Sequence, residues 1–535
     1  MLPVPSPSDD RREALRRGLL NTALKFGMGV DMAGSPYTWM MDTRELLLKQ
    51  PYLKLCGALL WERLRPYKPE AVGGMTLAAN PLTAAVLYEA WAEGYPLEGF
   101  LIRKMRKENG LRKLVEGPPL KAGMGVVLVD DMVNSGTTQR QAIRALEPFQ
   151  PHILAVGAVL DAERAGGEWL RDRGIGLEAL FGLTELGILT RPAPRTEGVE
   201  VAWRWGKLNS GTHSAPHSQP ALTADRIVVG SDQGIVICLD LQGRELWQFT
   251  ARDSRHGIHS SPVVREGKVW IGSYDGFVYC LDLSTGALVW ERRIAQWVGS
   301  SPVLDTEGKI VFIGAEYGDD RGGVVALHSE TGEPAWETLL PQYVHSSPCF
   351  DAARNRVLSG CNDGNLYSFN ADSGAIVWKS NTGGPIKAGP SIDAHGRCFA
   401  SSMNGSIFVF DAESGRILWS RRLGRSAYFR PLIHDELVFA AGSSGRLVCM
   451  ESATGEIHWI AATGSGIVGG AAMTEDGRIV VGSGDGCIYL LNAHDGRTLS
   501  TTRTGAAITV EPGVRGRFAA VPSRDGFLYC IALQP

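Results

Sequence analysis

Two adjacent carboxylates, Asp130 and Asp131, follow four apolar residues in the stretch VVLVDDMVNSGTT, residues 126–138. The apolar run predicts a buried strand, and the helical pattern QRQAIRAL follows the small and hydroxylated residues NSGTT. Backbone N–H groups and hydroxyls at the start of a helix form a favourable site for a phosphate. Carboxylates beside it would repel a phosphate, so we expect them to hold sugar hydroxyls, or Mg²⁺ bound to those hydroxyls.

The residues around this acidic pair alternate helical periodicity with short apolar runs. Helical patterns cover 53–64 and 82–94, and the segments 71–74, 126–129 and 153–161 predict strands. Such alternation is typical of an α/β domain in which helices cover both faces of a parallel sheet. The acidic pair is then expected at the end of one of these strands.

From about residue 198 the sequence becomes repetitive, most fully as GSYDGFVYCLDLSTGALVW, residues 272–290. Eight copies begin near positions 230, 272, 314, 360, 401, 441, 482 and 522. A period of about 40 to 46 residues with several short strands predicts an all-β propeller, here with eight blades. The last copy lacks its Trp-containing strand, and GVEVAWRW at 198–205 supplies one, so we expect this segment to close the ring. The predicted domains are 1–190 and 198–535, with 191–197 as the linker.

Most residues that recur in the repeats have a structural explanation. Asp-Gly and Asn-Gly pairs are hairpin turns that tolerate positive φ. The recurring Trp residues are expected as plugs between blades, and the recurring Cys residues as small core side chains. The Trp positions are 247, 290, 336, 378, 419 and 459, and the Cys positions are 238, 280, 449 and 530.

One set of polar repeat positions carries side chains that are able to bind a ligand. The segments THSAP, IHSSP, VHSSP and IKAGP place His213, His259, His345 and Lys387 at equivalent positions, predicted to face the axial channel. Three histidines have the chemistry to bind a metal or an anion. Polar residues that merely line a wet channel are the alternative interpretation.

The overall composition favours a cytoplasmic protein without a nucleic-acid or membrane partner. The net charge is -3 and 21% of residues are charged, so the overall composition is not basic and does not indicate a nucleic-acid partner. The nine cysteines include no CxxC pair, which favours reduced thiols. No segment has the pattern of a signal peptide or approaches the roughly 18 apolar residues of a membrane span.

The stretch 126–138 resembles the phosphoribosyl pyrophosphate (PRPP) motif of type I phosphoribosyltransferases. The resemblance implies that Asp130 and Asp131 hold the ribose 2′ and 3′ hydroxyls and, through these hydroxyls or water, Mg²⁺. It also implies a set of residues around the 5′-phosphate of PRPP. That set is Asn134, Ser135, Gly136, Thr137 and Thr138, of which Asn134 departs from the small residue usual in the family.

Two further segments resemble orotate phosphoribosyltransferases and concern pyrophosphate. Residues 71–86 resemble the pyrophosphate loop of that family and 100–123 its basic catalytic loop, so the resemblance implies pyrophosphate contacts from Thr76, Leu77, Ala78, Arg103, Lys104 and Lys107. Six basic residues lie between 103 and 113, and a closing loop of this kind neutralises charge on the leaving group. A solvated basic face is the bland alternative. We expect Lys107 and Asp131 to be the catalytic residues.

The base-binding side departs from that family. Asn109 occupies the position of the loop histidine of that family. Residues 28–34 contain no counterpart of the hood lysine. Ala162 occupies the position of a family arginine, and Arg164 lies two residues after it. We therefore expect transfer of phosphoribose, through an oxocarbenium-like state, to a nitrogenous acceptor other than orotate. Tyr37, Thr38 and Arg164 are the candidate acceptor-binding residues. The alternatives are ordinary orotate activity and a non-catalytic PRPP or nucleotide sensor or scaffold; a homodimer through the first domain is implied by the resemblance alone.

The repeats resemble the propeller of quinoprotein dehydrogenases and of the outer-membrane assembly lipoprotein that shares it. The resemblance implies the fold of about residues 198–535 and not quinone chemistry, because the adjacent disulfide-forming cysteines of the dehydrogenases are missing. We do not expect pyrroloquinoline quinone as a cofactor. The propeller is expected to bind substrate or a protein or peptide partner.

Overall fold

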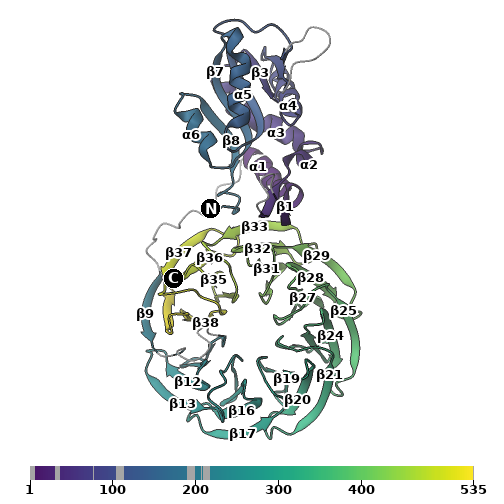
Figure 1. Ribbon diagram of the computed structural model, residues 1–535, viewed down its shortest axis with the longest axis vertical. Coiled ribbons are helices and arrows are strands. Elements are labelled where there is room, and N and C mark those ends of the chain that lie inside the picture. The colour runs from purple at the N-terminus through teal and green to yellow at the C-terminus, as the bar shows by residue number, and fades with distance from the viewer. Residues whose placement is uncertain are drawn as a thin grey trace. The chain divides into compact units, whose positions relative to one another are not determined.

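The chain folds into two compact units, which are described separately (Figure 1). The computed structural model describes residues 7–30, 36–75, 77–103, 114–189, 199–206, 208 and 217–533. The first unit comprises Met1–Lys25 and Trp39–Leu189, and the second comprises Phe26–Thr38 and Thr190–Pro535.

A six-stranded sheet in the order β5-β4-β3-β6-β7-β8 forms the centre of the first unit. Its strands are β3 Ala71–Met75, β4 Glu98–Ile102, β5 Val115–Glu116, β6 Gly125–Val133, β7 His152–Asp161 and β8 Gly176–Gly182. All neighbouring pairs are parallel except β4 and β5, which are antiparallel. The predicted parallel sheet is thus confirmed with one antiparallel edge strand, a common addition to α/β sheets.

Helices cover both faces of this sheet, as the alternating pattern predicts. They are α1 Pro7–Gly18, α2 Thr43–Leu47, α3 Tyr52–Leu64, α4 Ala79–Ala92, α5 Thr137–Leu146 and α6 Ala165–Arg171, with a π-helix at Leu19–Ala23 and 3₁₀ turns at Arg65–Tyr67 and Glu147–Phe149. Val126 and Leu128 of β6 pack with Ala142 and Leu146 of α5 in one buried cluster. A separate two-stranded sheet joins β1 Leu24–Val30 to β2 Pro36–Met41.

The connections reverse direction between β3 and β6. From β3 the chain passes through α4 to β4 on one side, and from β6 it passes through α5 to β7 on the other. Crevices at the carboxyl ends of strands beside such a reversal are the usual ligand sites of open α/β sheets. A ligand site is therefore expected at the carboxyl ends of β3 and β6.

The second unit contains eight four-stranded sheets arranged as a propeller, which confirms the prediction from the repeats (Figure 1). Blades 1 to 4 consist of β10 Ala221–Leu222, β11 Arg226–Gly230, β12 Ile235–Asp240, β13 Glu245–Thr250; β14 Val263–Arg265, β15 Lys268–Gly272, β16 Phe277–Asp282, β17 Leu288–Arg293; β18 Val303–Leu304, β19 Ile310–Glu316, β20 Gly322–His328, β21 Pro334–Leu340; and β22 Cys349–Asp351, β23 Arg356–Gly360, β24 Asn365–Asn370, β25 Ile376–Asn381. Blades 5 to 8 consist of β26 Ser391–Ile392, β27 Arg397–Ser401, β28 Ser406–Asp411, β29 Ile417–Arg422; β30 Leu432–His434, β31 Leu437–Gly442, β32 Arg446–Glu451, β33 Ile457–Ala462; β34 Ala471–Met473, β35 Arg478–Gly482, β36 Cys487–Asn492, β37 Thr498–Arg503; and β38 Gly513–Arg515, β39 Phe518–Pro522, β40 Leu528–Leu533, β9 Val199–Trp205.

The last blade is closed by the strand that comes first in the propeller sequence. β9 pairs antiparallel with β40, and Trp203 lies opposite Cys530. This pairing covers the outer edge of β40, as the missing Trp strand of the eighth repeat predicts. The propeller is therefore a closed ring rather than an open row of blades.

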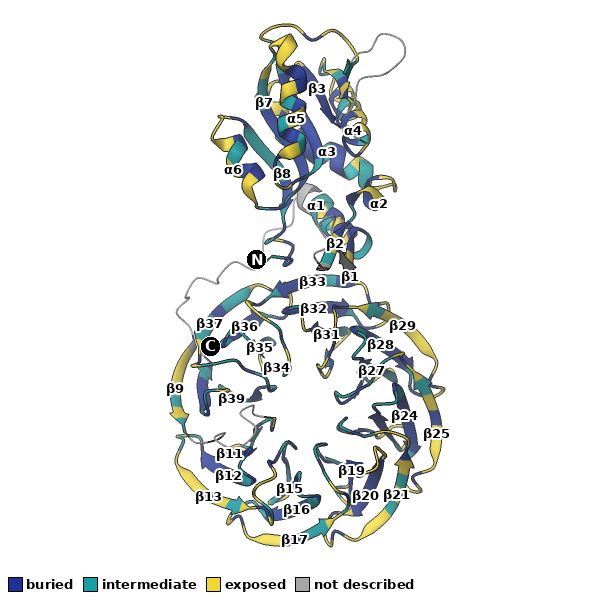
Figure 2. Cartoon of the chain, in the orientation of Figure 1, coloured by how far each residue is buried: buried dark blue, intermediate teal, exposed yellow. Residues whose placement is uncertain are grey.

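Tryptophans connect successive blades. The Trp247 indole N–H donates to the Leu283 carbonyl of the next blade at 2.8 Å, and Trp459 makes the same bond to Ala493 at 3.0 Å. A glycine with positive φ lies under each ring: a Cβ at Gly496 would be 2.4 Å from the Trp459 ring. The middle strands are buried, whereas the outer strands expose alternate residues (Figure 2). The Cys residues opposite Trp247, Trp459 and Trp203 are fully buried, as expected of core side chains.

Candidate functional site

The acidic pair lies inside the end of β6 rather than after it. Asp130 is 6% exposed, and its carboxylate accepts a 2.7 Å hydrogen bond from the buried Gln139 side chain of α5. The backbone N–H of Asp131 donates to Asp130 Oδ1 at 3.0 Å. Asp131 is half-buried, and its Oδ2 accepts a hydrogen bond from the Thr43 hydroxyl at the start of α2. The two carboxyls thus have different environments, one facing the core and one facing a cavity.

Burial, together with the neighbouring charge of Asp131, raises the pKa of the Asp130 carboxyl to about 8. The hydrogen bonds from the Asp131 backbone and Gln139 act in the opposite direction, because they favour the ionised form. The net effect favours the protonated form of Asp130 near neutral pH. A cation or a pair of hydroxyl donors would relieve the repulsion that keeps Asp130 protonated.

This pKa predicts how stability depends on pH. Between the ordinary pKa of 3.8 and about 8, the folded chain retains a proton on Asp130 that the unfolded chain has lost. The stabilising contribution is therefore complete below the lower value and is lost as pH rises through the window, with a slope of at most about 1.4 kcal/mol per pH unit. We expect the urea midpoint of the first unit to fall between pH 5 and 8 in the wild type and to stay nearly level in Asp130→Asn. Parallel pH profiles for the two proteins would contradict the protonated carboxyl.

The loop after β6 leads directly into α5. Gly136 precedes this helix with φ +79°, a conformation that favours glycine, and the Ser135 and Thr137 hydroxyls lie 3.0 Å apart. The Asn134 carbonyl accepts the Gly166 N–H at 2.9 Å, and a Cβ at Gly166 would come within 2.5 Å of that oxygen. Thr138 is the second residue of α5. The loop is therefore held against the start of α6, and its hydroxyls lie beside the first N–H groups of α5.

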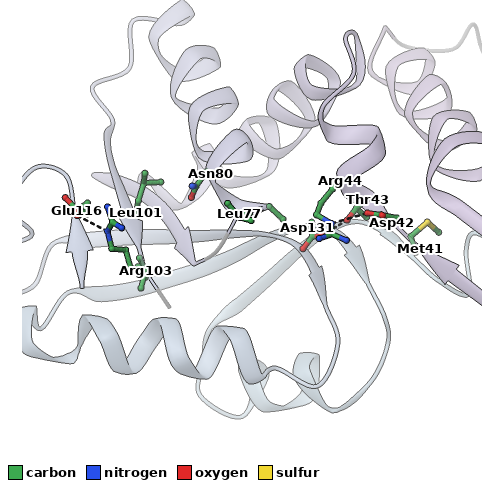
Figure 3. A pocket seen from close by; sticks show the side chains of 12 residues that line it. Met41, Asp42, Thr43, Arg44, Leu77, Asn80, Leu101, Arg103, Glu116 and Asp131 are labelled. Carbon is green, nitrogen blue, oxygen red and sulfur yellow. Dashed lines mark hydrogen bonds and ion pairs between the residues drawn. The ribbon is translucent and has the colours of Figure 1, made fainter. Parts of the chain in front are cut away.

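A cavity of about 870 Å³ opens at the carboxyl ends of β3 and β6, where the connections reverse (Figure 3). From the predicted residues it brings together Asp131, Leu77, Ala78 and Arg103. The residues of the 134–138 loop are not part of its lining. Asn80 at the start of α4 also lines it, so the N-terminal N–H groups of a 14-residue helix lie at the cavity.

Several lining residues were not predicted as individual site residues. Asp42, Thr43 and Arg44 come from the segment before and at the start of α2, and Glu116 from β5. Figure 3 shows Thr43 bonded to Asp131, and Arg103 paired with Glu116 at 2.9 Å. Tyr37 and Thr38 are predicted acceptor-binding residues from the nearby sequence, but no periodic or charge signal singles out Thr43. Gln139 was missed for a similar reason, because a single polar residue on an amphipathic helix has no signal of its own.

The predicted acceptor-side residues are only partly described. Arg164 is exposed and immediately precedes α6, and Ala162 is buried with its N–H bonded to the Val133 carbonyl at 2.9 Å. Tyr37 and Thr38 lie in β2, but their side chains are outside the described residues. Thr76, Lys104 and Lys107, with the rest of 104–113, also lie outside the described residues.

Hydrogen bonds in the propeller show which positions are equivalent to His259 and His345 in the repeats. Ser260, Ser300 and Ser346 accept the N–H of Gly272, Gly314 and Gly360 at 3.0, 3.0 and 3.1 Å. Ser218 accepts the N–H of Gly230 in the same way at 2.9 Å. The position equivalent to His259 and His345 is therefore His217, and His213 lies outside the described residues. The motif His-Ser-x-Pro occurs twice at 213–220, and counting back from Gly230 would have selected the second copy.

His217, His259, His345 and Lys387 line one cavity at the centre of the propeller. The His217 and His259 rings lie 4.2 Å apart between centroids, and His345 Nδ1 is 3.1 Å from a carboxylate oxygen of the buried Glu316. Within the described parts of the chain, no group of three or more His, Cys, Asp or Glu side chains is placed to hold a metal ion.

Comparison with known proteins agrees with both units. The phosphoribosyl transferase domain model matches residues 43–174, and the model described as outer membrane protein assembly factor BamB matches 232–366 and 362–531. Orotate phosphoribosyltransferase from Streptomyces coelicolor is 32% identical over 181 residues, which are 34% of this chain and 98% of that protein. The chain belongs to the phosphoribosyltransferase family, joined to a propeller of the BamB family. This phosphoribosyltransferase is a pentosyltransferase.

Further relatives support each half of this phosphoribosyltransferase. Orotate phosphoribosyltransferase from Aquifex aeolicus is 29% identical over 154 residues, covering 29% of this chain and 84% of that protein. The crystal structure of BamB from Moraxella catarrhalis has a TM-score of 0.52 at 22% identity and covers 62% of this chain and 99% of that chain. At this identity the second likeness establishes the propeller fold alone. None of the helices in the described ranges of the phosphoribosyltransferase is long and apolar enough to span a membrane.

Proposed function

We propose that the first unit transfers phosphoribose from PRPP, with Mg²⁺, to a nitrogenous acceptor other than orotate, and that the propeller binds substrate or a partner. The observation that carries the proposal is the unequal acidic pair at the carboxyl end of β6. Asp131 faces the cavity of about 870 Å³, and Asp130 lies buried behind it. Ribose hydroxyls donate hydrogen bonds, so they suit a pair of carboxylates whose charges repel each other.

The donor set also fits Mg²⁺. This hard cation prefers oxygen ligands and usually keeps several waters, so Asp130 and Asp131 would hold it through water or the ribose hydroxyls. When bound there, Mg²⁺ would neutralise the negative charge that grows on the pyrophosphate as the C1′–O bond breaks. A cation bound there would stabilise the ionised form of Asp130, which burial disfavours.

The phosphate groups of PRPP would lie on two helix starts. The loop 134–138 and the N-terminus of α5 suit the 5′-phosphate, and Leu77, Ala78 and the N-terminus of α4 suit the pyrophosphate. Arg103 adds a cation to the same cavity. By resemblance to the family, we assign to Lys107 the stabilisation of the departing pyrophosphate. Lys104 and Thr76 would make further contacts with the pyrophosphate. The C1′–O bond breaks with its electron pair on the pyrophosphate, and the acceptor nitrogen forms the new bond to C1′.

The acceptor side is the reason for proposing a different base. The relatives from Streptomyces coelicolor and Aquifex aeolicus are named for orotate, whereas here Ala162 is buried and Arg164 stands apart at the start of α6. A buried alanine offers no guanidinium to a carboxylate such as that of orotate. Thr43, Arg44 and Asp42 in the cavity provide other polar contacts, and Tyr37, Thr38 and Arg164 remain the proposed acceptor residues.

The test is pyrophosphate release by the full chain. Purified protein with Mg²⁺ and PRPP is incubated separately with orotate and with a panel of other nitrogenous acceptors. We expect release with an acceptor other than orotate and at least about tenfold lower kcat/KM with orotate. A preference for orotate would overturn the acceptor assignment and leave the transferase assignment intact.

Calorimetry separates the enzyme from a sensor. PRPP that binds in the presence of Mg²⁺ without any pyrophosphate release across the panel would support the non-catalytic alternative and overturn catalysis. Absence of both binding and release would overturn the PRPP site itself. A quantitative comparison needs a defined Mg²⁺ concentration, because the affinity of PRPP depends on the metal.

A further inference from the structure

The centre of the propeller holds a cavity of about 700 Å³ with walls from all eight blades. Each wall comes from an inner segment, the short stretch directly before the first strand of a blade. Segments of blades 2 to 5 contribute Ser261, Ser301, Ser347, and the pair Lys387 and Gly389. A volume of this size is typical of sites for small molecules.

Three serines of adjacent blades form a chain of hydrogen bonds along this wall. Ser261 Oγ accepts the Gln219 N–H at 2.9 Å, Ser301 Oγ accepts the Ser261 N–H at 2.8 Å, and Ser347 Oγ accepts the Ser301 N–H at 3.0 Å. Each hydroxyl therefore uses an acceptor lone pair within the protein and keeps its O–H as a donor. Within the described ranges, no acceptor receives any of these three O–H groups. Accepting a hydrogen bond also strengthens an O–H as a donor.

A cation continues this row in the next blade. Lys387 lines the cavity beside Gly389, which occupies the repeat position of the three serines and provides no hydroxyl. Within the described ranges, no carboxylate or hydrogen-bond acceptor pairs with the Lys387 ammonium. His345 lies beside Ser347 with its Nδ1 held 3.1 Å from Glu316, so Nε2 is the ring nitrogen left for a ligand. We call Ser261, Ser301, Ser347 and Lys387 the donor arc.

The opposite wall contains a carboxyl, Glu511, and a guanidinium, Arg430. Glu511 belongs to the segment of blade 8, which is opposite blade 4 in a closed ring of eight. Gln219 donates to Glu511 Oε1 at 3.0 Å, and burial raises the pKa of this carboxyl to about 7 while Arg430 and Gln219 lower it. The cavity therefore has three hydroxyl donors and Lys387 on one side, and Glu511 with the nearby cation Arg430 on the other.

We propose that the donor arc binds the oxyanion group, phosphate or carboxylate, of a small molecule inside the propeller. Three hydroxyl donors and an ammonium match the acceptor oxygens of such a group, and the closed ring keeps them at fixed spacing. The acid on the far wall faces the remainder of the molecule, where it can accept a hydrogen bond. This site is independent of the acidic pair in the first unit.

Calorimetric titration of the full chain tests the site, with inorganic phosphate and citrate as separate probes. We expect saturable binding of at least one probe, weakened roughly tenfold or more by Lys387→Ala and several-fold by the double variant Ser301→Ala with Ser347→Ala. Lys379→Ala is the matched control, because it removes the same charge from an exposed position on the outer strand β25 and should change affinity less than twofold. Glu511→Gln should tighten binding, since it removes a negative charge from the cavity.

The phosphate loop of the first unit is a second possible phosphate site, so Ser135→Ala is titrated in parallel. Phosphate binding that is lost in Ser135→Ala and retained in Lys387→Ala would overturn the proposal, as would equal loss in Lys387→Ala and Lys379→Ala. Binding of phosphate over citrate assigns the arc to phosphate groups, and the converse assigns it to carboxylates. Failure of both probes to bind would also overturn it. A selenate soak of crystals should place an anomalous peak at Ser301, Ser347 and Lys387.

Discussion

Asp131→Asn is expected to lower kcat/KM for pyrophosphate release by at least about a hundredfold, the usual effect of removing one precisely placed electrostatic contact to a reacting group. The amide keeps the shape of the side chain, and its oxygen can still accept the Thr43 hydroxyl. What it loses is the charge that polarises ribose oxygens as positive charge develops at C1′. Initial rates of pyrophosphate release at saturating Mg²⁺, measured with the best acceptor of the panel, give the comparison.

Two controls separate catalysis from folding in this experiment. Asp131→Asn also removes a like charge beside the buried Asp130, so the first unit should keep its stability or gain some. Thr43→Val removes the hydroxyl that contacts Asp131 while leaving its charge, and we expect a smaller loss of about threefold to thirtyfold. An Asp131→Asn protein with near wild-type kcat/KM would refute the proposed role of the acidic pair.

Trp459→Ala is expected to cost the propeller about 3 to 5 kcal/mol, the usual range for truncating a large buried aromatic side chain. Trp459 is 2% exposed, its N–H donates to the Ala493 carbonyl, and its ring covers Gly496 of the next blade. The substitution therefore opens a cavity between two blades and leaves a carbonyl without its donor. Urea unfolding of the full chain, followed by the transition assigned to the propeller, measures the loss.

Trp336→Ala is the matched control, because it removes the same side chain at the same repeat position. Trp336 is only half-buried, although it donates to Ala371 at 2.7 Å in the same manner. We expect a smaller loss than at Trp459. Equal losses at the two positions would show that the interblade hydrogen bond, rather than burial, determines the contribution of these residues.

The repeats made the propeller predictable, since the same strand and turn pattern occurs eight times and each copy supports the others. The α/β unit was also predictable in outline from β3, β6, β7, α3 and α4, which have strong apolar patterns. The short edge strand β5 and the hairpin β1–β2 were not, because their neighbours in space, rather than their own sequence, determine their pairing. The reversal between β3 and β6 likewise depends on strand order, which local periodicity does not encode.

The site was predictable where a contiguous motif carries it and not where distant segments meet. Residues 130–138 could be found from their own types and order, whereas Thr43 reaches Asp131 only after α2 packs against the end of β6. The role of Gln139 depends on the hydrogen bond that its side chain donates to the buried Asp130, and this contact exists only in the folded structure. The placement of His217 depended on which of two similar tetrapeptides is in register with Gly230, a question that hydrogen bonds decide.

The pairing of β9 with β40 makes the order of synthesis matter. The strand that closes the ring leaves the ribosome before any other strand of the propeller, and its partner β40 is made after all the other propeller strands. β9 must therefore wait, unpaired, while seven blades form, and its closing contact carries the largest loop-closure cost in the propeller. A chain that terminates early never receives the partner strand and retains open strand edges that invite association with other chains. Closure of the ring thus distinguishes a complete propeller from one that lacks its last strand.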